Sequence, residues 1–158
     1  MNDLSAIANA MRTGCPAMHL RQASRVLARV YDAAFRPLGL ELSQLPVVAT
    51  VAARGDAGIS VGELARALVM DRTTVTRAIR PLEKAGFLRV ARSLEDARSK
   101  IVVTTRAGER VVRASYPIWE RTTRRIREML GASRVDALNV ELAKLIAAGS
   151  RLADRTRG

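Results

Sequence analysis

The chain has few of the residues that build catalytic and metal sites. Its 158 residues include one cysteine, Cys15, and one histidine, His19, and aromatic residues make up only 3%. A single cysteine excludes an intrachain disulfide and fits a reducing cytosol. A single histidine leaves no His/Cys/carboxylate cluster for zinc and no base to activate a serine, and no glycine-rich phosphate loop occurs. We therefore expect no enzyme, no cofactor and no metal.

Long apolar runs are also missing. No stretch of about 20 apolar residues could span a bilayer, and the N-terminus lacks the basic-then-apolar pattern of a signal peptide. The length suits one domain that can bury a core. We expect a cytoplasmic protein with no membrane partner.

Positive charge is what the chain has in excess. Lys and Arg number 27 against 15 Asp and Glu, which gives a net charge of +12 and favours a polyanionic partner. The plainer interpretation is a basic, arginine-rich chain with no such partner. Residues 54–106 and 107–158 each hold 11 basic and 6 acidic side chains, so charge alone does not locate a binding surface.

Two short helices joined by a tight turn are predicted between residues 60 and 86. Ser60 and Glu63 have the spacing of a capping box, in which each side chain accepts a hydrogen bond from the other residue's N–H. Leu68-Val69-Met70 makes the turn, and Asp71 is an N-cap residue for the second helix. Three apolar residues of that helix recur at helical spacing and can pack inward: Val75, Ile79 and Leu82.

The other faces of the second helix carry threonines and arginines. Arginine can donate twice to guanine, while threonine offers a methyl group to thymine and a hydroxyl to bases or phosphates. A small rigid helix with this surface suits the DNA major groove. The alternative is an ordinary solvated helix face.

A two-stranded hairpin follows. Gly86 is placed to end the second helix in the left-handed conformation. Residues 87–91 and 100–104 are apolar and β-branched enough to be strands, and the polar residues 92–99 between them form the tip. The segment therefore predicts a helix-turn-helix with a two-stranded wing.

Helices are predicted before this segment. Apolar residues from 19 to 35 fall on one helical stripe, which Pro37 and Gly39 end. A second helix spans about 42–54, where Pro46 is tolerable because it lies in the first turn.

Two more helices are predicted after the hairpin. Thr105 can cap a long helix that Gly131 breaks, and Ser133 has the pattern of an N-cap for the last helix. We expect residues 1–12 and 153–158 to be loose ends.

Several motifs in combination resemble the MarR family of bacterial winged helix-turn-helix transcriptional regulators. They are Leu38-Gly39-Leu40, Gln44, Leu64-Ala65, Asp71-Arg72-Thr73-Thr74-Val75-Thr76-Arg77, Leu82-Glu83-Lys84-Ala85-Gly86, Asp96-Ala97-Arg98-Ser99 and Thr105-Arg106-Ala107-Gly108. The Asp-x-Arg-Ser wing after a Leu-Glu-x-x-Gly helix end is specific as a pair, whereas each motif alone is weak.

This resemblance implies a mainly α fold with a small β-wing. A winged helix-turn-helix domain would be flanked by N- and C-terminal dimerisation helices. The MarR-type domain would span residues 14–150, with the DNA-binding core at 42–104 and the dimerisation helices at 14–38 and 105–153.

The implied function is sequence-specific binding of double-stranded DNA by a homodimer that regulates transcription as repressor or activator. Two-fold symmetry places the two recognition helices about 34 Å apart, so the operator should be a near-palindrome. The flanking helices could instead complete a monomeric core. A nucleoid-type or RNA-binding module, and a winged-helix protein–protein adaptor, are the rival interpretations.

The candidate DNA contacts lie in the second helix and the wing. They are Arg72, Thr73, Thr74, Thr76, Arg77, Arg80, Asp96 and Arg98. Arg98 suits a narrow A·T-rich minor groove, and Asp96 could hold it in place. Arg89, Arg92 and Lys100 are phosphate neighbours or plain surface charge. Arg80 precedes Pro81, which removes a helical hydrogen bond and can bend the helix there.

Release from DNA could follow binding of a small anionic aromatic or phenolic effector, or thiol oxidation. The candidate residues are Cys15, His19, Arg21, Tyr31 and Trp119. Hydroperoxide sensors of the family carry a cysteine upstream of a Ser-Arg pair like Ser24-Arg25. Here Cys15 lies two residues farther from that pair and precedes Pro16, so an inert cysteine is the alternative.

Overall fold

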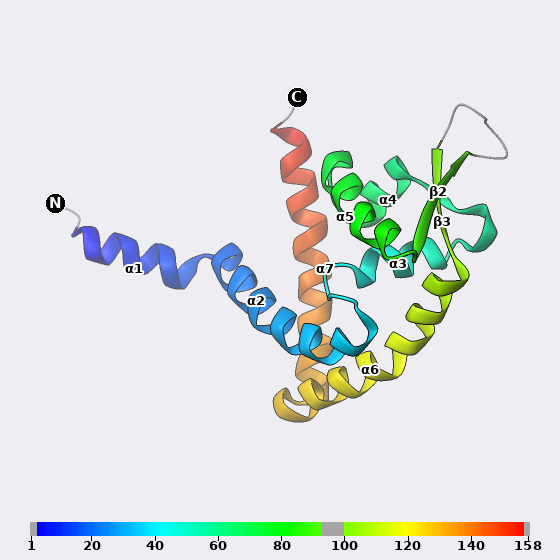
Figure 1. Cartoon of the computed structure of the whole chain (residues 1–158). Coiled ribbons are helices and arrows are strands. Elements are labelled where there is room, and N and C mark those ends of the chain that lie inside the picture. The colour runs from blue at the N-terminus through cyan, green and yellow to red at the C-terminus, as the bar shows by residue number, and fades with distance from the viewer. Residues whose placement is uncertain (1–2, 93–99, 157–158) are drawn as a thin grey trace. The chain divides into compact units, whose positions relative to one another are not determined.

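The computed structural model describes residues 3–92 and 100–156. The chain divides into two compact units, Met1–Trp119 and Glu120–Gly158, and each is described by itself. The first unit contains helices and a small sheet, and the second is helical (Figure 1). Across these described stretches, no helix combines the length and the apolar character that crossing a membrane requires.

The first unit begins with two helices in succession, α1 (Leu4–Gly14) and α2 (Pro16–Phe35). The prediction of a loose N-terminus is wrong for α1. Asp3 caps this helix by accepting from the Ser5 N–H at 3.0 Å. Apolar side chains also recur along α1 at helical spacing, but none of its residues is buried. Cys15 has an extended backbone and separates α1 from α2.

Helix α3 (Leu45–Ala52) follows a short 3-10 helix, η1 (Arg36–Leu38), and Gly39, whose φ is +63°. Pro46 lies in the first turn of α3, as predicted. The segment before α3 is held by Asp32, whose carboxylate accepts from the Leu42 N–H at 2.6 Å.

The helix-turn-helix consists of α4 (Val61–Ala67) and α5 (Arg72–Lys84). It follows a second 3-10 helix, η2 (Gly55–Ala57). The N-cap residues of the two helices are those that the capping patterns predicted, Ser60 and Asp71.

The sheet has three antiparallel strands in the order β1-β3-β2, so the prediction of two strands is incomplete. Strands β2 (Leu88–Arg92) and β3 (Lys100–Thr104) form the predicted hairpin. The added strand, β1 (Ile59–Ser60), pairs with β3 so that Ile59 lies opposite Val102. Two residues are too short a run to show the alternation by which a strand is recognised.

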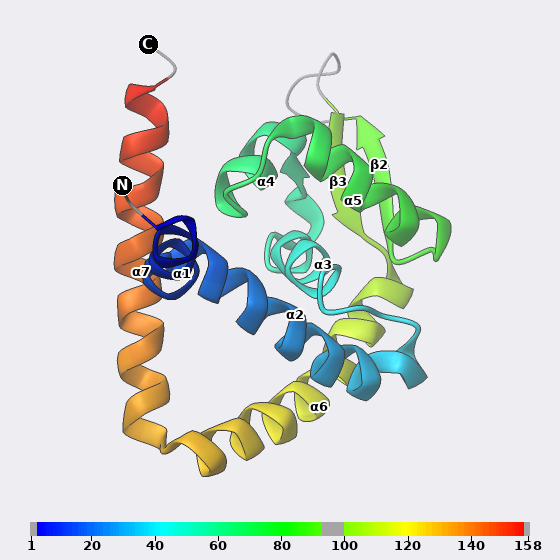
Figure 2. The ribbon, with the colours of Figure 1, turned by 90° about the vertical axis from the view of Figure 1, so that its left-hand side faces the viewer.

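The core of the first unit lies between α3, α4, α5 and the sheet, which the two ribbon views show together (Figures 1 and 2). Val75, Ile79 and Leu82 of α5 are buried, as their spacing predicted. The largest fully buried side chains are Phe35, Leu64, Leu82, Leu88, Val47, Val48, Val51, Val75 and Val102.

Helix α6 (Arg106–Leu130) runs from the first unit into the second, and α7 (Ala132–Arg155) follows it. Gly131 separates them with a φ of +90°, which confirms the predicted break. Two predictions are wrong here. Ser133 lies inside α7 rather than capping it, and the helix continues to Arg155 through residues expected to be loose. Within the second unit, Arg127 and Asp136 form a bidentate ion pair, in which both terminal guanidinium nitrogens donate to the carboxylate.

Candidate nucleic-acid interface

The first helix of the helix-turn-helix is fixed at its start by the predicted capping box. The Ser60 hydroxyl oxygen accepts from the Glu63 N–H at 3.2 Å, and a Glu63 carboxylate oxygen accepts from the Ser60 N–H at 3.0 Å. The Ser60 hydroxyl also donates to that carboxylate at 2.7 Å. These hydrogen bonds to Ser60 lower the pKa of the Glu63 carboxyl below its ordinary value.

The turn between the helices places Val69 in the left-handed region, with φ at +53°. A β-branched residue adopts this conformation only under strain. The turn is held by the Met70 N–H, which donates to the Ala65 carbonyl oxygen at 2.9 Å. It therefore gives α5 a defined starting direction.

Asp71 caps α5 with both of its carboxylate oxygens. One accepts from the Thr74 N–H and the other from the Thr74 hydroxyl, each at 2.7 Å. These bonds lower the pKa of the Asp71 carboxyl. The proton of the Thr74 hydroxyl is thus used within the cap, and the hydroxyl is left with only its accepting capacity.

One face of α5 gathers five of the predicted DNA-binding residues. Together they line a shallow surface depression of about 400 Å³. These residues are Arg72, Thr73, Thr76, Arg77 and Arg80. All five are exposed, and no acidic side chain of residues 3–92 and 100–156 lines the depression. Thr74 is exposed but lies outside it.

Two members of this face have internal partners. The Thr76 hydroxyl donates to the Arg72 carbonyl oxygen at 2.7 Å, so Thr76 presents its methyl group and an accepting oxygen. The Arg72 guanidinium lies against Gly62 of α4. The position of the Arg72 guanidinium is therefore set by α4 as well as by α5.

Pro81 does not end α5, which continues to Lys84. The helix then closes with the Gly86 N–H donating to the Glu83 carbonyl oxygen at 2.9 Å, and Gly86 has the predicted positive φ of +75°. Glu83 also accepts from the Val90 N–H at 3.2 Å, which ties the end of α5 to the first strand of the hairpin.

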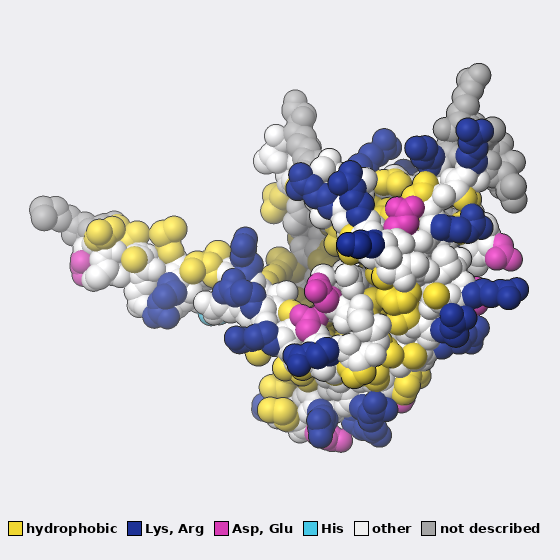
Figure 3. Space-filling model, in the orientation of Figure 1, with side chains coloured by type: hydrophobic (Ala, Val, Ile, Leu, Met, Phe, Trp, Pro, Cys, Tyr) yellow, Lys and Arg dark blue, Asp and Glu magenta, His cyan; other side chains and the backbone are white. Residues whose placement is uncertain are grey.

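The described strands of the wing carry exposed positive charge. Arg89 and Arg92 are exposed on β2, and Lys100 lies opposite Arg92 at the start of β3. Figure 3 shows Lys and Arg side chains over this part of the molecule. Asp96 and Arg98, the predicted minor-groove residues, lie outside the described residues.

Thr105, the predicted cap of α6, also joins α5, the hairpin and α6 in a junction that the sequence did not predict. The Thr105 hydroxyl donates to the Gly86 carbonyl oxygen at 2.6 Å and accepts from the Gly108 N–H at 3.0 Å. The Thr105 N–H donates to the Phe87 carbonyl oxygen at 3.1 Å. Gly108 is required here, because a β-carbon would come 2.1 Å from that same carbonyl oxygen. The Thr-x-x-Gly spacing was the available signal.

The comparisons with known proteins agree with this geometry. Residues 40–100 match the model of the MarR family. The winged helix-turn-helix is therefore of the MarR type.

The solved structures similar to this chain include complexes with DNA. The Mycobacterium tuberculosis transcriptional regulator MosR in complex with DNA is 28% identical, with a TM-score of 0.69, and the match covers 84% of this chain and 98% of that one. A mutant Escherichia coli MarR complexed with operator DNA is 20% identical, with a TM-score of 0.76 and coverage of 91% and 99%.

A third solved structure has a small molecule bound. CouR from Rhodococcus jostii with p-coumaroyl-CoA is 18% identical, with a TM-score of 0.69 and coverage of 82% and 90%. A search of the curated proteins finds no match. The matched segment is thus the DNA-binding part of a MarR-type transcriptional regulator, a family whose members are not enzymes.

The residues predicted for regulation lie in different surroundings. Cys15 is half-buried at the N-cap of α2, and the nearby His19 ring nitrogen lies 2.9 Å from the Thr13 carbonyl oxygen. Tyr31 is buried and stacks on Phe35 with ring centroids 5.9 Å apart.

The other two regulatory candidates lie on exposed surface. Trp119 is exposed beside Tyr116, with ring centroids 5.8 Å apart, and Arg21 is exposed on α2. None of the five candidates lines the depression on α5 or the one on α2 formed by Gln22, Arg25, Val26 and Arg29. Within residues 3–92 and 100–156, no group of three His, Cys, Asp or Glu side chains could hold a metal ion.

Proposed function

We propose that the protein acts as a homodimer that inserts α5 of each subunit into successive major grooves of a near-palindromic operator. The observation that carries this proposal is one face of α5 that gathers Arg72, Thr73, Thr76, Arg77 and Arg80, with no acidic side chain among the described residues that line the depression. Phosphates attract such a face, and its arginines and threonines can also read base edges.

The five residues fall into those placed to contact bases and those placed to contact phosphates. Arg77 is the best candidate for a bidentate contact to guanine, because it is exposed in the middle of the face. Thr73 and Thr76 offer methyl groups to thymine, and Arg72 and Arg80 suit phosphates at the two ends of the face. Thr74 is a weaker candidate for a phosphate contact, because its hydroxyl already donates a hydrogen bond to the Asp71 carboxylate.

The wing completes the proposed interface. Arg98 would enter the minor groove beside the major-groove contact, with Asp96 holding it. This part of the proposal rests on the sequence motif, since both residues lie outside the described stretches. Arg89 and Arg92 on β2 supply positive charge beside them.

The dimer is supported by apolar surface on the helices outside the winged core. In α2 only Tyr31 and Phe35 are buried, and α1 buries nothing. Yellow side chains along these helices are visible in Figure 3. The exposed large apolar residues of α1, α2 and α7 include Leu4, Ile7, Met11, Leu20, Val26, Leu27, Val30, Leu138, Val140, Leu145, Ile146 and Leu152. Surfaces of this kind mark association sites, and we assign residues 14–38 and 105–153, together with α1, to the dimer.

The proposal is tested by finding the operator and measuring its selectivity. Genomic fragments that the purified protein enriches are sequenced, and the best site is compared with random duplex at two salt concentrations. We expect a near-palindrome, two subunits per site, and affinity for the operator at least about a thousandfold above random DNA. Equal affinity for all duplexes would instead indicate a nucleoid-type module, and no DNA binding at either salt concentration an adaptor.

We further propose that a small anionic effector releases the operator. The depression on α2 is lined by Arg25 and Arg29 and measures about 420 Å³, which suits a carboxylate or phenolate. The p-coumaroyl-CoA bound to CouR is an anionic aromatic molecule of this kind. Such a ligand acts only through its different affinity for the two states of the protein, and a full switch needs about 5 kcal/mol of difference. Oxidation of Cys15 is the competing trigger.

A further inference from the structure

The segment of residues 36–44 connects α2, a helix assigned to the dimer, with the DNA-binding core, and we call it the elbow. The chain turns at Gly39, whose φ is +63° and whose N–H donates to the Arg36 carbonyl oxygen at 3.0 Å. The next residue, Leu40, is buried. Figure 2 shows the elbow between the end of α2 and α3. It is thus a packed turn with a defined backbone and not a free linker.

A reciprocal pair of hydrogen bonds fixes the exit of the elbow into α3. The Glu41 N–H donates to the side-chain oxygen of Gln44 at 3.0 Å, and the Gln44 N–H donates to the Glu41 carbonyl oxygen at 3.0 Å. Gln44 and Gly39 are among the residues that carry the resemblance to the MarR family. Both therefore have a role in holding the elbow, which the proposed DNA contacts do not account for.

Asp32 ties the elbow back to α2. Its carboxylate accepts from the Leu42 N–H at 2.6 Å, and its carbonyl oxygen accepts from the Arg36 N–H. Asp32 is half-buried in the helix assigned to the dimer, and Leu42 is the first residue of the proposed DNA-binding core. A hydrogen bond to a carboxylate is stronger than one between neutral groups. This bond therefore fixes the direction in which the core leaves α2.

The two parts of α2 have different surroundings. Leu20 and Leu27 are exposed in the part that we assign to the partner subunit, whereas Tyr31 and Phe35, on either side of Asp32 in the sequence, are buried. Helix α2 therefore carries the proposed dimer surface in its first part and the anchor of the core in its last part. Asp32 lies where the second role begins.

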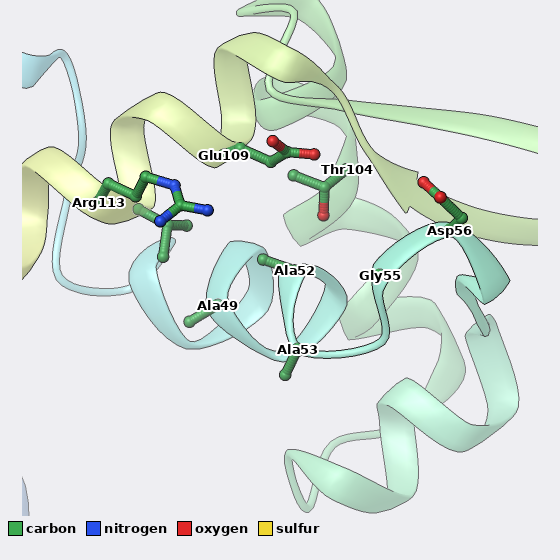
Figure 4. Close-up of a pocket in the computed structure, with 9 residues that line it drawn as sticks. Ala49, Ala52, Ala53, Gly55, Asp56, Thr104, Glu109 and Arg113 are labelled. Carbon is green, nitrogen blue, oxygen red and sulfur yellow. The ribbon is translucent and has the colours of Figure 1, made fainter.

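Helix α3 has little support on the side that faces α6. Its residues Ala49, Ala52 and Ala53 line a hollow of about 600 Å³, and Figure 4 shows Glu109 and Arg113 of α6 across from them. The small side chains leave this space unfilled, so α6 does not brace α3 there. The hold of the elbow on the start of α3 therefore matters more for the position of the core.

We propose that Asp32 determines which half-site spacing the dimer accepts. It is a positioning residue, because it touches no DNA in the proposed arrangement and acts through the elbow. Its bond to the Leu42 N–H fixes how each core leaves α2, and with it the distance and rotation between the two cores of a dimer. This inference rests on the proposed homodimer.

One base pair is a large change for a dimer with rigidly held cores. Inserting it between two half-sites moves them apart by about 3.4 Å and rotates one about the DNA axis by about 34°. Rigid cores then cannot engage both half-sites, and the advantage of binding the second half-site intramolecularly is lost. A loosened elbow lets the cores follow the change, at the cost of ordering them on the DNA.

The test compares four duplexes by fluorescence anisotropy with the full-length protein. They are the operator found by enrichment, the same operator with its centre shortened or lengthened by one base pair, and a single half-site. Wild type should bind both altered operators at least about tenfold more weakly than the original. Asp32→Ala should bind the original about three- to tenfold more weakly than wild type does, and the altered ones within about threefold of that value.

The single half-site separates positioning from folding. It requires only one correctly folded core, so Asp32→Ala should bind it as tightly as wild type does. An equal loss on the half-site and on every operator would overturn the proposal, because Asp32 would then only support the fold.

Two further variants separate the hydrogen bond from the charge. Asp32→Asn keeps an oxygen that can accept from the Leu42 N–H and should keep the spacing preference. Asp56→Ala removes the same charge from an exposed residue of η2, at the other end of α3 (Figure 4), and should also keep it. Loss of the preference in either variant, to the extent seen in Asp32→Ala, would overturn the role of this hydrogen bond.

The wild-type and variant measurements fail in different ways. If wild type binds all spacings alike, the proposed dimer on a near-palindrome is wrong and this inference falls with it. If wild type discriminates and Asp32→Ala discriminates equally, the dimer stands and only the role of Asp32 is refuted.

Discussion

Arg72 of α5 lies against Gly62 of α4. A β-carbon placed on Gly62 would come within 3.2 Å of the Arg72 Nη2 atom and 3.6 Å of Cζ. The absence of a side chain at position 62 thus sets where the first arginine of the proposed DNA-binding face can rest.

Gly62→Ala should separate stability from DNA binding. Alanine favours helix, and the crowded atom belongs to the end of a flexible side chain, so unfolding free energy should stay level or rise by about 0.5 kcal/mol. The displaced Arg72 should weaken operator binding about two- to fivefold by loss or shift of one phosphate contact. Gly149→Ala in α7, where a β-carbon meets nothing within 4 Å, is the control for the effect of an added methyl group on helix stability. An unchanged affinity in Gly62→Ala would show that the Arg72 tail does not depend on this contact.

Arg77→Ala should cost about 1–3 kcal/mol of operator binding and relax the preference at one base pair in each half-site. Fluorescence anisotropy on the operator and on duplexes changed at single positions measures both effects. Arg54→Ala, at an exposed arginine outside both the proposed DNA-binding face and the helices assigned to the dimer, serves as the charge-matched control. An even loss across all sequences with a shallower salt dependence would reassign Arg77 to a phosphate.

Asp71→Asn should alter the acid stability of the protein. The pKa of Asp71 in the folded state lies below its ordinary value, so the cap stabilises the fold above about pH 4 and loses this contribution as the pH falls through the folded-state pKa. Asparagine caps helices about as well but does not titrate. Wild type and variant should therefore have similar stability at pH 7, and the variant should lose less on acidification. Urea unfolding from pH 7 to pH 3 measures this, and parallel curves would contradict the assignment.

Gly108→Ala should destabilise the junction between the hairpin and α6. The added β-carbon would meet the Phe87 carbonyl oxygen at 2.1 Å, and a backbone atom cannot move aside as a side chain can. We expect a loss of about 3 kcal/mol in chemical unfolding. The same Gly149→Ala control should show no loss.

Cys15→Ser separates the two proposed triggers. The variant should release its operator normally in response to a small-molecule effector and should be blind to peroxide. DNA release is followed by anisotropy, and thiol oxidation by mass spectrometry. If wild type keeps its operator while Cys15 is oxidised, the thiol has no sensing role.

The parts of the fold that the sequence predicted correctly are those fixed by local hydrogen bonds. Ser60, Asp71 and Thr105 each cap a helix through a partner within three residues, and such pairs are visible as spacing. Gly86 was predicted for the same reason, because a positive φ at a helix end is a property of one residue.

What sequence reasoning missed depends on contacts between distant segments or on weak local patterns. Strand β1 exists because Ile59 meets Val102, a partner more than 40 positions away. The cap expected at Ser133 was displaced because α7 begins directly after Gly131. At the candidate site, the outward residues of α5 followed from periodicity. The contact between Arg72 and Gly62 could not be predicted, because it joins two helices.

The Thr105 hydroxyl also has a consequence for the order in which the chain folds. Its bond to the Gly108 N–H is local, whereas its bond to the Gly86 carbonyl oxygen and that of the Thr105 N–H to the Phe87 carbonyl oxygen form only when the two ends of the hairpin meet. Closing a loop costs entropy before its contacts form. The amide of Thr105, which donates to the Phe87 carbonyl oxygen, should therefore exchange with solvent as the hairpin opens, and not as a helix end frays. The exchange rate of that one amide proton therefore measures how the wing opens.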